Sequence, residues 1–183
     1  MGLTLADQYY IKAWDNYGYD LAEVVENLNY ALSYSSGHTN ANCLMGRVYS
    51  EYLNNPEQAA YYFEQALSND LTNRDVIRYY TYMLIHQRDF AKAKKMIDYG
   101  YTVKGMNQAM LMHYEALLAE YQKDYKKAIK LLKSAQNESY SEREANFLKS
   151  EISRVKAKTK QTKEKGKSDK PKKKKKAAKK KKN

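Results

Sequence analysis

The sequence contains few of the residues that characterise secreted, membrane or β-rich proteins. Its single cysteine, Cys43, excludes a disulfide framework and a thiolate metal cage. Two prolines and seven glycines in 183 residues are too few for the turns of a β-sandwich or barrel. The densest apolar stretch, residues 79–85, is much shorter than the roughly 18 residues of a membrane span. The N-terminus lacks a basic segment followed by an apolar core, so we expect a cytoplasmic protein without a membrane span.

Positive charge is concentrated at the C-terminal end. Residues 156–183 contain sixteen lysines against Glu164 and Asp169, whereas residues 1–155 carry a net charge of −2 and the whole chain +12. The lysine-rich segment has no aromatic or branched aliphatic side chain, so it cannot bury enough apolar surface to offset the entropy of ordering it. We therefore predict a folded domain over residues 1–155 and a disordered polylysine tail over residues 156–183.

Apolar residues in the folded part recur at helical spacing. Ser141 and Glu144 form a capping-box pair that opens an apolar stripe with Ala145 and Leu148. A second stripe, within residues 128–135, has lysines on the opposite face. Short polar breaks separate segments of about a dozen residues, close to the mean length of a helix. The predicted fold class is all-α.

The polar breaks are regularly spaced, which indicates an internal repeat of 34 or 35 residues. Each polar turn is followed by a small residue, a bulky apolar residue and a second small residue. Small side chains allow two helices to cross closely, and the bulky residue fills the gap to the next pair. An ordinary helical bundle with coincidental spacing is the alternative. The first small position holds Val24, Ala59, Ala93 and Ala128; the bulky position holds Leu28, Phe63, Ile97 and Leu132; the second small position holds Ala31, Ala66, Gly100 and Ala135.

This pattern resembles the tetratricopeptide repeat family, whose unit is a helix–turn–helix of about 34 residues. The resemblance covers roughly residues 5–140 and is carried by Gly46, Tyr49, Ala59, Phe63, Ala66, Asp89, Phe90, Ala93, Asp124, Tyr125 and Ala128. It implies a right-handed α-solenoid of about four helical pairs. An Asp or Asn before each second helix is its expected N-cap. Residues 141–155 are predicted to form the C-terminal capping helix that covers the last repeat.

The resemblance also implies a concave groove lined by the first helix of each pair. Arg47 and Arg78 would present guanidinium groups there to a carboxylate of a bound peptide. In the alternative interpretation, both arginines pair within the chain, with Glu51 and Asp75. The family's carboxylate clamp needs Lys and Asn where Cys43, Arg47 and Arg78 stand, which argues against that specialised role. The residues expected to face the groove are Cys43, Arg47, Ser50, Asp75, Arg78, Tyr82, His113, Leu117 and Glu120.

Motifs for catalysis are weak or absent. His38, His86 and His113 are far apart in the sequence, and none has a second metal ligand at helical spacing. The nineteen tyrosines all lie within residues 1–155. Large rings with a polar tip suit both a thin, partly wet solenoid core and a recognition surface. We predict a protein without enzymatic activity, cofactor or metal.

The polylysine tail is expected to bind a polyanion. Compact lysine runs associate with nucleic acid through counterion release, without sequence preference. Such runs also suit nuclear import in a eukaryote, or ribosomal and anionic lipid surfaces in a bacterium. A merely solubilising tail is the alternative. The lysines expected to contact the polyanion are Lys172, Lys173, Lys174, Lys175, Lys176, Lys179, Lys180, Lys181 and Lys182.

Together these patterns predict a non-enzymatic interaction scaffold. The groove would hold a protein or peptide partner, and the tail would tether the array to a polyanion. The alternative is a nucleic-acid- or ribosome-associated protein in which the basic tail is the functional part and the repeats dimerise or position it. The sequence leaves open whether the array forms a homo-oligomer.

Overall fold

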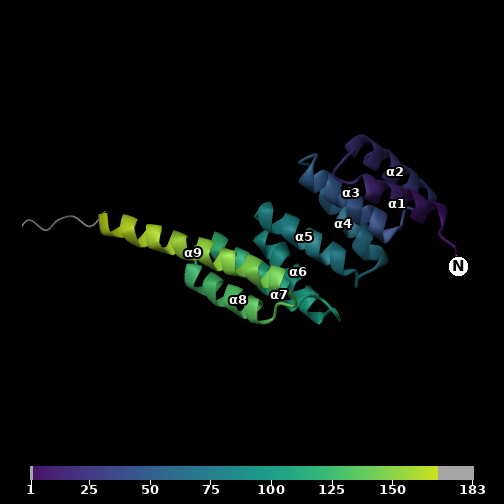
Figure 1. The fold of residues 1–183 in the computed structure, drawn as a ribbon. Helices are drawn as coiled ribbons and strands as arrows, with labels where there is room; N and C mark the ends of the chain where they lie inside the picture. Colours follow the sequence, from purple (N-terminus) through teal and green to yellow (C-terminus); the bar gives the residue numbers. More distant parts are fainter. Residues whose placement is uncertain (1, 169–183) are drawn as a thin grey trace, which may run out of the picture.

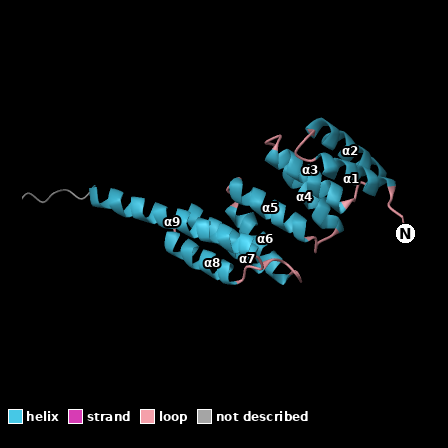
Figure 2. Cartoon of the chain, in the orientation of Figure 1, coloured by secondary structure: helices cyan, strands magenta, loops and turns pink. Residues whose placement is uncertain are grey.

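The computed structural model describes residues 2–168, and it describes side chains as far as residue 160. Within this part of the chain every regular element is an α-helix, which confirms the all-α prediction (Figure 2). Consecutive helices pack in adjacent pairs along an elongated molecule, an arrangement consistent with an α-solenoid (Figure 1). The helices are α1 Leu5–Asn16, α2 Leu21–Tyr34, α3 Thr39–Glu51, α4 Pro56–Asn69, α5 Arg74–His86, α6 Phe90–Thr102, α7 Gln108–Tyr121, α8 Tyr125–Asn137 and α9 Glu142–Ser168.

Polar side chains determine where the helices begin. In α1 to α8 the residue before the helix accepts a hydrogen bond from the backbone N–H three residues later, which satisfies one of the unpaired donors of the first turn. The predicted caps of α2, α4, α6 and α8 are confirmed. For α9, the Ser141 hydroxyl accepts from the Glu144 N–H. The caps of α1 to α8 are Thr4, Asp20, His38, Asn55, Asn73, Asp89, Asn107 and Asp124.

The repeated small and bulky residues form the interior of the helical pairs. All the positions that the spacing singled out are buried, and Ala59, Ala93 and Ala128 are 0% exposed. The crossing of α3 and α4 is especially close, since a Cβ atom added at Gly46 would lie 3.0 Å from the Phe63 ring. The predicted register is therefore confirmed at the level of burial.

The core extends along the molecule as three apolar clusters. The first joins α1, α2 and α3 around Leu28, and the second reaches from α3 to α7 around Phe63. The third joins α7, α8 and α9 around Leu132. Tyr49 packs against both the first and the second cluster. Each pair of helices thus completes the interior of its neighbour, as in other repeat proteins.

The last helix is longer than the sequence predicts. Leu148, Ile152 and Val155 are buried, in one apolar cluster with residues of α7 and α8, as a helix that covers the last pair requires. However, α9 continues to Ser168, beyond the predicted start of the tail at residue 156. Extending an existing helix costs far less than nucleating one, and this stretch is rich in good helix formers. The predicted polyanion-binding lysines between residues 172 and 182 lie outside the described residues.

Candidate functional site

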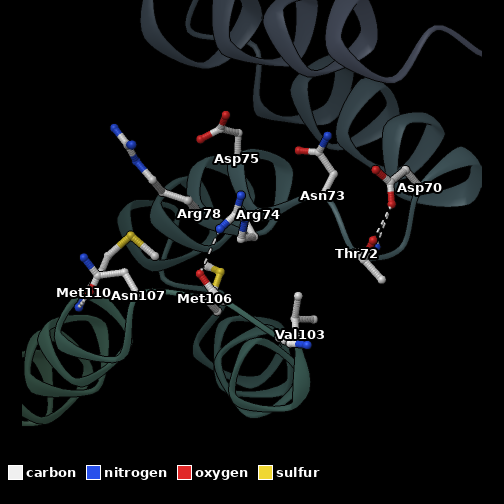
Figure 3. Close-up of a pocket in the computed structure, with 12 residues that line it drawn as sticks. Asp70, Thr72, Asn73, Arg74, Asp75, Arg78, Val103, Met106, Asn107 and Met110 are labelled. Atoms are coloured by element: carbon white, nitrogen blue, oxygen red, sulfur yellow. Dashed lines mark hydrogen bonds between the residues drawn. The ribbon is translucent and has the colours of Figure 1, made fainter.

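A groove of about 520 Å³ is bordered by α3, α5, α7 and α9. Four of the predicted groove residues line it: Arg47, Arg78, Tyr82 and His113. A second hollow, of about 930 Å³, lies at the N-terminal ends of α5 and α7 and includes the predicted Asp75. Figure 3 shows the residues that line this second hollow, with Asp75 and Arg78 on α5 and with Asn107 and Met110 at the start of α7. Arg78, Asn107 and Met110 border both spaces, so the two hollows are neighbours on the same face of α5 and α7.

The remaining predicted groove residues lie elsewhere. Leu117 and Glu120 border a separate hollow of about 290 Å³ between α7 and α9. Cys43 is buried in the central core, and burial raises the pKa of its thiol to about 12. Ser50 is half-buried on α3 and borders none of these spaces. The expected row of groove residues is therefore split, because the offsets along one helix do not capture how the next helix is rotated.

Arg47 is tied into the body of the protein. Its Nε donates to Glu51 Oε1 at 2.9 Å, and Glu51 Oε2 also accepts from the Tyr17 hydroxyl at 2.8 Å. The guanidinium lies 4.3 Å from the centre of the Tyr17 ring and 4.1 Å from that of Tyr79. Only 12% of its side chain is exposed. Arg47 thus links α1, α3 and α5, and the predicted intrachain pair with Glu51 is confirmed.

The surroundings of Arg78 differ from those of Arg47. Its side chain is exposed, and among the described side chains its guanidinium forms no ion pair or hydrogen bond. The alternative pairing with Asp75 is therefore wrong, and the two side chains diverge in Figure 3. The guanidinium lies 4.5 Å from the centre of the Tyr79 ring. The Tyr114 hydroxyl of α7 donates to the Arg78 carbonyl at 3.2 Å, which positions this turn of α5.

Aromatic rings line much of the groove, and most of them were not singled out from the sequence. Tyr82 lies 6.4 Å from Tyr114, and His113 lies 5.2 Å from Phe147, measured between ring centres. Tyr79 separates the two arginines. The abundance of tyrosine was the available signal, but composition does not say which rings share a surface.

His113 lies at the contact between α7 and α9. Its Nε2 atom is buried without a hydrogen bond among the described residues, and it lies 3.8 Å from Glu151 Oε2. Burial lowers the pKa of His113, against the opposing effect of the Glu151 carboxylate. Burial thus favours the neutral form of this imidazole.

The carboxylates that line the groove already have partners within the chain. Glu51 is paired with Arg47, and Glu144 accepts hydrogen bonds from the Asn107 side chain at 2.8 Å and from the Tyr140 N–H at 3.0 Å. Within the described side chains, Arg78 is consequently the one charged group of this groove that has no charged or hydrogen-bonded partner.

The described part of the chain matches neither the pattern of a metal site nor that of a membrane-spanning helix. Residues 2–160 hold no cluster of three or more His, Cys, Asp or Glu side chains placed to bind a metal. No helix within the described residues has the length and apolar character needed to cross a membrane. Comparisons with protein-family models, curated proteins and solved structures gave no match to this chain. What the protein binds has to follow from the chemistry of the groove.

Proposed function

We propose that this chain is a non-enzymatic binding module. Its four helical pairs form a right-handed array of the tetratricopeptide type, and the concave groove over α3, α5, α7 and α9 holds an extended segment of a partner protein. The observation that carries this proposal is the exposed guanidinium of Arg78, which lies beside aromatic rings and has no ionic partner among the side chains that the structure describes.

The partner segment carries a carboxylate opposite Arg78. A guanidinium offers a planar pair of donors that matches a carboxylate, and its contact with the Tyr79 ring keeps that plane in place. The neighbouring exposed ring of Tyr82, which packs against the buried Tyr114, supplies apolar contact area and shields the pair from water. The groove thereby combines one charged contact for orientation with ring contacts for affinity, a usual division of labour in binding sites.

Affinity purification with full-length protein from its own host tests this proposal. We expect Arg78→Gln to lose partners that the unaltered chain retains, because the carboxylate contact is removed while the fold is kept. Arg143→Gln, at an exposed arginine on α9 outside the groove, is the matched control and should retain them. Arg47 is left intact, since it links three helices. Identical partner sets for both variants would contradict the proposal.

A second candidate function rests on the charge of the C-terminal segment. Residues 156–183 hold sixteen lysines and two acidic residues. Such a density of cations favours association with nucleic acid or the ribosome. In that case the basic segment is the main functional element, and the helical array positions it. The salt dependence of nucleic-acid binding tests this second function, because contacts with phosphates weaken steeply as salt is added.

A further inference from the structure

We infer that the segment held in the groove is a polyproline-II helix, with prolines at every third position and one acidic residue that contacts Arg78. This inference rests on the proposed function and deepens it by naming the class of peptide. It is carried by two observations, the placement of rings on neighbouring helices and the distribution of charge between them, together with the usual spacing of packed helices.

Aromatic rings of α5, α7 and α9 line the groove, α1 adds Trp14 beside Arg47, and three of these rings are well exposed. Trp14 on α1 is 50% exposed, Tyr82 on α5 is 45% exposed and Phe147 on α9 is 49% exposed. Arg47 connects them near α3, where its guanidinium lies 5.8 Å from the Trp14 ring and close to Tyr79. Flat aromatic surfaces of this kind are the surfaces on which proline-rich segments dock.

The spacing of the helices matches the period of a polyproline-II helix. Packed helices lie about 8–10 Å apart. Within the array α3 packs directly against α5, and α5 against α7. A polyproline-II helix has three residues per turn and rises about 3.1 Å per residue, so one of its faces recurs roughly every 9 Å. A peptide that crosses the helices therefore presents an equivalent residue to each of them in turn.

The backbone of such a peptide also finds donors in the groove. A polyproline-II helix has no internal hydrogen bonds, so its carbonyl groups need external donors. The hydroxyls of Tyr79 and Tyr82 form no hydrogen bond among the described side chains and border the groove. Because the peptide is already extended before it binds, less conformational entropy is lost than with a flexible chain.

Charge favours this occupant over a single-stranded nucleic acid. Rings and cations together also suit nucleic acids, whose bases stack on aromatic side chains. However, a backbone with one phosphate per nucleotide needs several cations, whereas among the described side chains of this groove Arg78 is the one charged group without a partner. A peptide with a single acidic residue matches that one guanidinium.

Fluorescence anisotropy with synthetic probes tests the inference. The probe is a labelled twelve-residue peptide with proline at every third position and one central glutamate. Three matched probes serve as controls. In one peptide every proline is replaced by alanine, in another the glutamate is replaced by glutamine, and the third probe is a twelve-residue oligouridylate. The full-length protein is compared with Tyr82→Ala and Arg78→Gln. Tyr61→Ala, at an exposed tyrosine on α4, and Arg143→Gln are the matched controls. All variants share the lysine tail, so differences between them report on the groove.

We expect the alanine-substituted peptide to bind at least about tenfold more weakly, and Tyr82→Ala to weaken binding of the proline peptide to a similar extent. Replacing glutamate by glutamine should weaken binding to the unaltered protein but not to Arg78→Gln. Thermal unfolding by circular dichroism verifies that the variants are folded; if Tyr82→Ala is not, Tyr82→Leu takes its place.

Three results would overturn the inference. Equal binding of the proline and alanine peptides would remove the polyproline-II assignment, while Arg78-dependent partners in the purification would leave the proposed function standing. Oligouridylate binding that falls in Tyr82→Ala, without any peptide binding, would identify the groove as a nucleic-acid site. Absence of groove-dependent binding for every probe would also refute it, and the purification then decides separately whether the groove binds a protein at all.

Discussion

At the scale of single residues, the turns inside the helical pairs use a left-handed backbone. Gly18 has a φ of 94°, Asn54 of 47°, and Arg88 and Lys123 of 62°. Glycine adopts this region without steric cost and asparagine tolerates it, whereas a long side chain is strained there. The last two pairs therefore reach the same turn with less suitable residues than the first two.

Lys123→Gly is expected to stabilise the protein by about 0.5–1 kcal/mol, because the relief of strain exceeds the added freedom of the unfolded chain. The free energy of unfolding in urea measures this change. Lys130→Gly, at an exposed position inside α8, is the control and should cost about 1 kcal/mol, since glycine is a poor helix former. If both substitutions destabilise the protein to the same extent, the turn is not strained.

Arg47 and Arg78 show how far the role of a residue depends on its surroundings. The residue type is the same, and each stands on the first helix of a pair. Glu51 of the same helix and the rings of Trp14, Tyr17 and Tyr79, which come from α1, its C-cap and α5, surround Arg47. Among the described side chains, Arg78 contacts the Tyr79 ring and forms no ion pair. Arg47 thus holds helices together, whereas the guanidinium of Arg78 remains exposed.

At the scale of elements, the docking of α9 on α7 combines apolar and polar contacts. Glu120 of α7 accepts from Arg154 at 2.5 Å and from Lys158 at 2.7 Å. Although burial acts in the opposite direction, these hydrogen bonds lower the pKa of Glu120. Lys158 belongs to the stretch that was predicted to be disordered, so this contact helps to explain why α9 continues beyond residue 155.

His113 makes this contact sensitive to acid. Its pKa is lowered in the folded state by burial, so the unfolded chain binds the proton more readily. We expect the free energy of unfolding to fall as the pH drops from about 7 to 5, by at most about 1.4 kcal/mol per pH unit from this group. The carboxylates of Glu151 and Glu120 raise the pKa of this imidazole, whereas the Arg154 guanidinium lowers it.

Urea unfolding at pH 7.5 and 5.5 measures the effect of His113→Gln. The difference between the two pH values should be smaller in this variant than in the unaltered protein, because the group that takes up the proton is gone. His86→Gln, at an exposed histidine on α5, is the control and should keep the larger difference. An unchanged pH dependence in His113→Gln would show that this imidazole is not responsible.

At the scale of the whole molecule, two regions with different charge are joined by α9. The groove lies within the helical array, and α9 extends from the array toward the lysine-rich end (Figure 1). One region thus presents rings and a single available guanidinium, whereas the other presents many lysines. The proposed function, in which one partner is held near a polyanion, uses both regions.

The lysine runs should govern binding to polyanions. We expect the full-length protein to bind mixed-sequence DNA at 50 mM salt, and to lose about a thousandfold in affinity by 200 mM if six or more phosphates are contacted. Replacing the nine lysines of residues 172–176 and 179–182 by glutamine should abolish this binding, whereas Arg78→Gln should leave it unchanged. Anisotropy titrations measure both. Equal binding by the nine-fold variant would refute a role for these runs.

Much of the fold could be predicted from the sequence, because the signals are local. Helical periodicity, the polar breaks and the caps such as Asp89 and Asp124 act within one or two turns of a helix. The small residues Ala59 and Ala93 mark where helices cross, and their spacing set the register. The sequence predicts that the last helix ends at residue 155, whereas α9 continues to Ser168, and the contact of Lys158 with Glu120 of α7 is not a local signal.

The site could be predicted only in part. From the sequence by itself follow the helical pairs, their register and the set of arginines and rings available on the first helix of each pair. Only the tertiary structure decided that Arg47 is enclosed and Arg78 is exposed, and that Phe147 joins a groove with Tyr82. The physical reason is that periodicity fixes the faces of one helix, whereas pairing and exposure depend on how distant helices are rotated against each other.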